Sequence, residues 1–153
     1  MKKQAEGLSL VELAVVMIVV LILAIGAVTA FQSFLISVKV TAVKQALEQM
    51  RRGIKDFYID QTLQGSPRFP VLEEVSEDSG RSVVMIDGNL PDNPLDTDGD
   101  RDNVVEALSE PRGTIIGTTG GWVYRPRESS PGARDAGEIW ANTATPGIDE
   151  NTF

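Results

Sequence analysis

The side chains of this sequence that could take part in chemistry are almost all oxygen donors. The chain has 153 residues, with no histidine and no cysteine. It therefore has no imidazole base, no thiol nucleophile and no disulfide. Carboxylates remain, and in proteins they suit hard cations such as calcium and magnesium better than zinc. We expect a protein that is not an enzyme.

The densest group of carboxylates surrounds a glycine within residues 95–102. Aspartates occupy alternate positions there, at Asp96, Asp98, Asp100 and Asp102. Calcium takes six to eight oxygen ligands, and a tight glycine-hinged loop can bring alternate carboxylates to one centre. The spacing differs from that of an EF-hand loop, because the glycine follows the second aspartate. Two interpretations stay open at this point: a calcium site and a solvated acidic turn.

A single carboxylate, Glu12, stands at the edge of a long apolar stretch. Residues 13–38 contain no charged side chain, and Lys39 follows them. As a helix these 26 residues would span roughly 39 Å, more than the ~30 Å hydrocarbon core of a bilayer. A carboxylate beside a membrane helix is costly. We therefore expect Glu12 to have a cationic partner.

The chain divides near residue 60 into two parts of different composition. Residues 1–59 contain no proline and carry a net charge of +3, whereas residues 60–153 hold all eight prolines and carry −11. After the apolar stretch, apolar residues recur at spacings of three and four up to Ile59, which predicts an amphipathic helix. We predict one helix over residues 8–59, with 13–38 in the membrane, followed by an acidic domain over residues 60–153. The negative charge argues against binding to nucleic acid.

The acidic domain shows short strand candidates between turn signals, at residues 81–86, 114–117, 121–125 and 137–141. The last two predict an antiparallel hairpin whose alternate residues face the long helix. Residues 72–77 or 102–108 would add one helical turn, and residues 143–153 would form a loop. The pairs Glu73-Glu74 and Asp149-Glu150 are interpreted as solvated surface. The expected fold is α+β, with the long helix packed on a small antiparallel β-sheet that has long loops.

The amino terminus resembles the type IV prepilin signal, which pseudopilins of type II secretion systems share. A short basic leader ends in Gly7, Leu8 follows, and Glu12 is the fifth residue after the glycine, before the apolar stretch. The resemblance implies a pilin-like fold and a leader of residues 1–7. It also implies cleavage between Gly7 and Leu8 by a prepilin peptidase that then methylates the Leu8 amine. Glu12 would pair with the terminal amine of a neighbouring subunit. The chain departs from the family in having Leu8 where Phe is more common, and in having no proline within the apolar stretch.

The resemblance implies a structural subunit of a periplasmic pseudopilus, anchored in the bacterial inner membrane with its domain in the periplasm. Its partners would be further pilin-like subunits, the prepilin peptidase and an inner-membrane assembly platform. Calcium would be consistent with it, since major pseudopilins use calcium in this part of the chain. Three alternatives remain: a type IV pilus pilin, a monomeric membrane-anchored binding module, and an ordinary signal peptide cut after Ala30.

Overall fold

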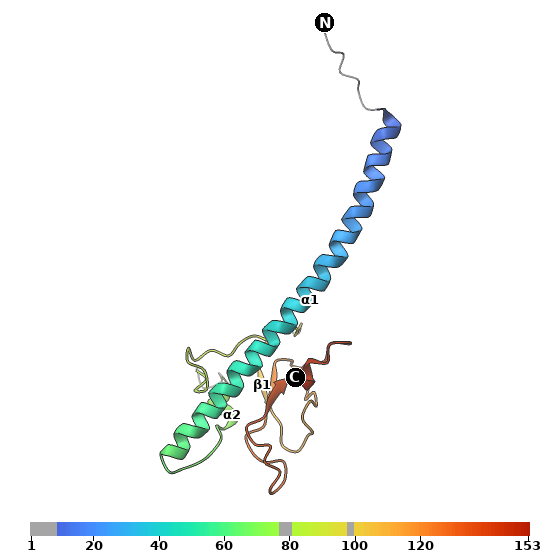
Figure 1. Cartoon of the computed structure of the whole chain (residues 1–153). Coiled ribbons are helices and arrows are strands. Elements are labelled where there is room, and N and C mark those ends of the chain that lie inside the picture. Colours follow the sequence, from blue (N-terminus) through green and yellow to red (C-terminus); the bar gives the residue numbers. More distant parts are fainter. Residues whose placement is uncertain (1–8, 77–80, 98–99) are drawn as a thin grey trace. The chain divides into compact units, whose positions relative to one another are not determined.

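The computed structural model describes residues 9–76, 81–97 and 100–153. These residues fall into two compact units, Met1–Val38 and Lys39–Phe153. One helix, α1 (Leu10–Leu63), begins in the first unit and ends in the second (Figure 1). The prediction of a single long helix at the amino-terminal end is confirmed. It continues about one turn beyond the expected end at Ile59.

The described part of the first unit is the apolar part of α1. Every side chain from Leu10 to Val38 is exposed. Two polar side chains in this part bond to their own helix: the Thr29 hydroxyl donates to the carbonyl oxygen of Gly26 at 3.0 Å, and the Ser33 hydroxyl to that of Thr29 at 3.2 Å. Such bonds satisfy hydroxyl donors without water. Both hydroxyls can therefore enter an apolar environment.

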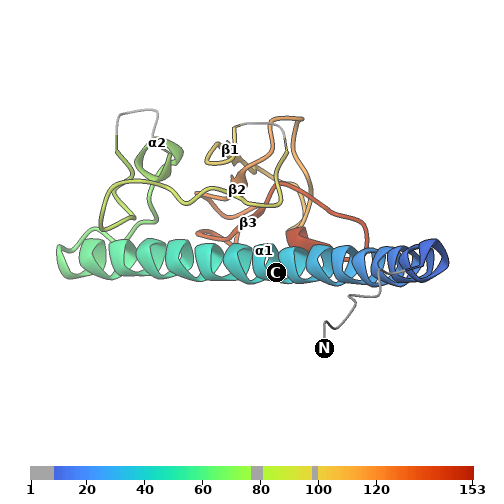
Figure 2. The same cartoon turned by 90° about the horizontal axis from the view of Figure 1, so that it is seen from above.

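In the second unit, α1 packs one face against a small sheet. The buried residues of the helix follow the spacing of three and four that a single helical face requires: Val43, Ala46, Leu47, Met50 and Ile54. They form one core with the residues of the sheet that face them: Trp122, Tyr124, Ile139 and Ala141. Figure 2 shows the strands beside this part of α1.

The sheet has three strands, β1 (Val104–Glu106), β2 (Trp122–Tyr124) and β3 (Ile139–Ala141), in that spatial order. β2 and β3 pair antiparallel, with Trp122 opposite Ala141, so the predicted hairpin is confirmed. β1 pairs parallel with β2. The sheet is therefore mixed, and the expectation of a purely antiparallel sheet was wrong.

The alternation predicted for the hairpin is also present. The side chains of Val123 and Trp140 lie on the face away from α1, where they pack with Ala107. The Trp140 indole N–H donates to the carbonyl oxygen of Thr114 at 2.9 Å, which satisfies the polar end of a buried aromatic side chain. Both faces of the hairpin are thus covered by the domain itself.

Of the remaining expectations for the domain, one is confirmed and others are wrong. A helical turn forms at α2 (Leu72–Val75), as predicted for residues 72–77, but residues 102–108 contain β1 instead of a helical turn. Residues 81–86 and 114–117 were expected to be strands and contain none. The tail, expected to be a loop, ends in a single 3₁₀ turn, η1 (Glu150–Thr152).

Candidate functional site

The helix α1 starts with a reciprocal pair of hydrogen bonds between Ser9 and Glu12. The backbone N–H of Ser9 donates to Oε2 of Glu12 at 2.7 Å, and the backbone N–H of Glu12 donates to the Ser9 hydroxyl at 3.2 Å. This is a capping box, which satisfies two backbone donors that the first helical turn leaves free. Glu12 therefore has a role within its own chain, which our sequence analysis missed although Ser-x-x-Glu is the usual signal.

Gly7 and Leu8, the residues of the predicted processing site, lie outside the described residues. Among those described, α1 is the one helix long and apolar enough to cross a membrane, by length and composition. The side chains of its apolar part, residues 10–38, are all exposed, which gives this part of the helix a large hydrophobic surface. Glu12 is the acidic residue in the first turn of that helix.

The described aspartates of the predicted calcium site, Asp96, Asp100 and Asp102, do not share one environment. Asp96 is buried, with 2% of its surface exposed, and its Oδ2 accepts a hydrogen bond from the backbone N–H of Gly121 at 2.7 Å. Asp100 is exposed and Asp102 half-buried, while Asp98 lies outside the described residues. Within residues 9–76, 81–97 and 100–153, no three acidic side chains gather as a metal would require. The calcium site stays a prediction.

Asp96 instead stabilises the turn that leads into β2. Gly120 and Gly121 both have positive φ, at 65° and 72°. A Cβ on Gly120 would overlap the Asp96 carboxylate, and one on Gly121 would overlap the carbonyl oxygen of Asn103. Asp96 also borders a hollow of about 350 Å³ that Thr97, Gly120 and Asn142 help to line. The carboxylate holds the glycine turn close to the chain before β1, which brings β1 and β2 together.

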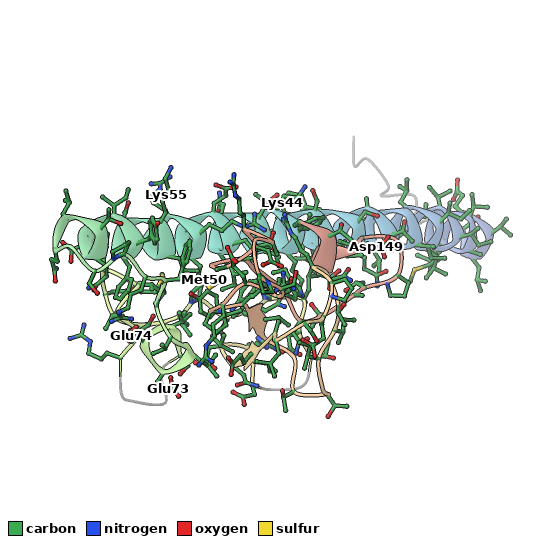
Figure 3. All side chains as sticks on the ribbon, turned by 90° about the horizontal axis from the view of Figure 1, so that it is seen from below. Lys44, Met50, Lys55, Glu73, Glu74 and Asp149 are labelled. Carbon is green, nitrogen blue, oxygen red and sulfur yellow. The ribbon has the colours of Figure 1, made fainter. Side chains whose placement is uncertain are left out.

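The two acidic pairs interpreted as solvated surface differ from one another. Glu74 forms a bidentate ion pair with Arg68, at 2.6 and 2.7 Å, close to the surface. Figure 3 shows Glu73 and Glu74 on the side of the domain away from α1. Glu150, by contrast, has no exposed surface, so the interpretation was wrong for this residue. Glu150 lies in a part of the sequence that contains several Thr and a Gly, and this composition does not indicate a buried carboxylate.

Glu150 is stabilised by the chain around it. Its carboxylate accepts hydrogen bonds from the backbone N–H of Thr145 at 2.9 Å and from the Thr145 hydroxyl at 2.8 Å. Burial raises the pKa of Glu150, but these hydrogen bonds and those from its own backbone and Thr143 together lower it by more, so the pKa lies below the ordinary value. The carboxylate is therefore charged at neutral pH, and its hydrogen bonds hold the tail residues Thr145 and Glu150 together.

Comparisons with known proteins do not assign the chain to a family. No protein-family model, no curated protein and no solved structure matches the chain. Two features of the chain itself point to a function: Glu12 at the start of the exposed apolar part of α1, and an acidic domain packed on the continuation of the same helix.

Proposed function

We propose that this protein is a pilin-like structural subunit that polymerises through α1, and specifically a pseudopilin of a type II secretion system. The observation that carries the proposal is a carboxylate, Glu12, in the first turn of α1, whose exposed apolar part continues into the helix of a folded domain. A membrane anchor has no need for a charged residue at that point. A subunit that must place its helix beside others does need it, because the charge can select a partner.

The proposal gives the protein a location and partners. Residues 13–38 would lie in the bacterial inner membrane, with the domain on the periplasmic side. The prepilin peptidase would remove residues 1–7 and methylate the amine of Leu8. An assembly platform would then add the subunit to a filament with further pilin-like subunits. The choice of a pseudopilin over a type IV pilus pilin depends on the absence of cysteine and on the small, turn-rich domain.

The capping box gives Glu12 a second role, and the test has to separate the two. Glutamine at position 12 keeps the capping geometry and removes the charge, because Gln serves in capping boxes as Glu does. Alanine removes both. Ser9→Ala is the matched control, since it weakens the cap and keeps the charge of Glu12.

The experiment expresses the full-length variants in a bacterium with a working prepilin peptidase and compares membrane insertion with the yield of sheared, sedimentable polymer. The proposal predicts normal insertion for all of them, loss of polymer in Glu12→Gln and Glu12→Ala, and retention of polymer in Ser9→Ala. If Glu12→Gln assembles as the wild type does, the charge is not what selects the neighbour. If no polymer forms at all, from the wild type or from any variant, the chain is a monomeric membrane-anchored module.

A further inference from the structure

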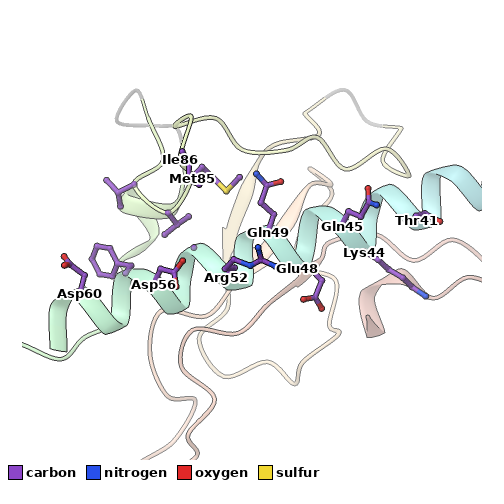
Figure 4. Close-up of a pocket in the computed structure, with 14 residues that line it drawn as sticks. Thr41, Lys44, Gln45, Glu48, Gln49, Arg52, Asp56, Asp60, Met85 and Ile86 are labelled. Carbon is purple, nitrogen blue, oxygen red and sulfur yellow. The ribbon is translucent and has the colours of Figure 1, made fainter. Parts of the chain in front are cut away.

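A groove with one apolar wall runs along α1 in the second unit. It has a volume of about 850 Å³ and lies between the outer face of α1 and residues 83–86 (Figure 4). Val83 and Ile86 form the apolar wall and are 57% and 105% exposed, respectively. Together they give the groove an exposed apolar edge. This groove has the size of a binding site and no occupant from its own domain.

The apolar wall of the groove is held firmly on the helix. The backbone carbonyl of Val84 lies where a side chain at position 53 would be, so only glycine is accommodated there. Gly53 thus allows the segment to approach the helix backbone. The groove is a fixed feature of the domain, and a partner would not have to order its wall on binding.

The helical wall of the groove carries charges of both signs, with Lys44, Glu48 and Arg52 along its length and two aspartates at one end. Asp56 and Asp60 both line it, one helical turn apart, and both are exposed. Residues four apart on a helix lie on the same face. A segment that fills this end should carry positive charge together with small apolar groups that can pack against Val83 and Ile86.

The same domain presents such a segment in the loop between β2 and β3. Its base is fixed by Arg125, which is 2% exposed and pairs with Asp135 at 2.7 Å and with Glu138 at 3.0 Å. Ser129 donates to the Asp135 carboxylate from its hydroxyl at 2.5 Å and from its backbone N–H at 2.9 Å. The Ser129 hydroxyl bond, together with the backbone bond, holds the pKa of Asp135 below its usual value. The loop is therefore ordered by its own polar contacts.

The tip of this loop carries two arginines without partners. Arg127 and Arg134 are exposed, and among the residues that the structure describes neither has an ion pair or a hydrogen bond through its side chain. Pro131 and Ala133, also exposed, supply small apolar groups between them. Unpaired cations on a rigid loop stand out in a region of net charge −11. Glu128 lies between them in the sequence, so the loop of residues 127–134 carries a net charge of +1, which complements the aspartates at the end of the groove.

We propose that the loop of residues 127–134 in one copy of this chain binds in the groove between α1 and residues 83–86 of a second copy. Arg127 and Arg134 would lie beside Asp56 and Asp60 of the second copy, with Pro131 and Ala133 against its apolar wall. The loop connects β2 to β3, whereas the groove is formed by α1 and residues 83–86, so the two surfaces belong to different parts of the domain. A contact between two different faces leaves one of each free, so it can repeat along a filament. This contact depends on the proposed polymerisation, and the loop and the groove would be the surfaces through which two subunits touch.

The absence of cysteine makes a direct test possible, because engineered thiols are the only ones in the chain. The full-length single variants Ala133→Cys and Ile86→Cys carry different epitope tags and are co-expressed. The membranes that contain them are then treated with an oxidant that forms disulfides. The inference predicts a mixed disulfide dimer between the two variants, and a ladder of larger products from the double variant. The matched control replaces Ile86→Cys by Leu108→Cys, a residue that is 63% exposed and does not line the groove. A mixed dimer no more abundant than in that control would overturn the inference.

A charge exchange tests the ionic part of the contact. Replacing Arg127 and Arg134 by Asp should lower the yield of cross-linked dimer by about twofold to fivefold, as expected for exposed ion pairs. Replacing Asp56 and Asp60 by Arg in the partner chain should restore it. Loss without restoration would contradict the pairing, and so would a cross-link from Ala133→Cys to some other protein.

The yield of sedimentable polymer distinguishes this inference from the proposed function. If the cysteine variants sediment as polymer but the groove pair does not cross-link, subunits assemble through other surfaces and the inference alone fails. If no polymer forms and no cross-link appears, the proposed polymerisation fails together with it. Polymer with the specific cross-link supports both.

Discussion

The substitution Gly53→Ala tests the packing of residues 83–86 on α1, because two effects of known size oppose each other there. In the interior of an exposed helix, alanine is more favourable than glycine by about 0.8–1 kcal/mol. Helix propensity alone therefore predicts stabilisation. At position 53, however, the added methyl would overlap the carbonyl oxygen of Val84 and lie 2.9 Å from its carbonyl carbon.

The obstructing atoms belong to the backbone, so no side-chain rotation relieves the overlap. Inserting a methyl into such a site typically costs about 1–3 kcal/mol. Combining a cost of about 2 kcal/mol with the gain in propensity, we expect the domain to lose about 1 kcal/mol. That corresponds to a fall in Tm of roughly 4–8 °C for a domain of this size.

The assay is thermal unfolding of the full-length protein in detergent, followed by near-ultraviolet circular dichroism. The signal comes from the domain, because Trp122 and Trp140 are both buried in it. Gly26→Ala is the matched control: Gly26 also lies within α1, but nothing is within 4 Å of a Cβ there. It should leave the Tm of the domain unchanged. A higher Tm for Gly53→Ala would refute the packing of Val84 on the helix.

Three further predictions concern the domain. Because the pKa of Glu150 is lowered in the folded protein, its contribution to the free energy of unfolding should be complete above the ordinary carboxyl pKa of 4.5 and lost as the pH falls below it. Glu150→Gln should remove that part of the pH dependence of unfolding and lower the free energy of unfolding by about 1–3 kcal/mol at neutral pH. Arg125→Met leaves Asp135 and Glu138, which are partly exposed, without their cation and should lower the free energy of unfolding by about 1–3 kcal/mol; an unchanged free energy of unfolding would contradict the pairing. Calcium at a hundredfold excess over its Kd should stabilise the domain by about 2.7 kcal/mol if the predicted site exists; an equal shift of Tm in Asp98→Ala would contradict it.

The sequence predicted the elements whose patterns are long or whose partners are near in the chain. The helix was foreseen because its apolar spacing persists from Leu10 past Ile54, and the hairpin because β2 and β3 each alternate inward and outward residues. β1 was not foreseen. Its parallel pairing with β2 depends on Gly121 lying against Asn103, a contact between residues distant in the chain that no local pattern marks.

For the candidate site, the sequence pointed to individual residues but not to their contacts. Glu12 was expected to pair with a cation outside its own chain, which stays a prediction, and its capping bonds with Ser9 were not foreseen. The aspartate repeat suggested one shared centre, whereas Asp96 is directed to the backbone of Gly121. Side chains two apart in a turn need not converge, since each can be drawn to a separate backbone donor. Burial of Glu150 depends on hydrogen bonds that no sequence pattern marks.

The most direct test of the proposed function is the intact mass of the full-length chain purified from the membranes of a bacterium with an active prepilin peptidase. A pilin-like subunit should begin at Leu8 and carry one methyl group on its terminal amine. The mass should therefore correspond to residues 8–153 plus a methyl group. A mass that begins at Phe31 would show an ordinary signal peptide cut after Ala30, and a mass that still includes Met1-Lys2-Lys3 would show that no leader is removed. Either result would contradict the account.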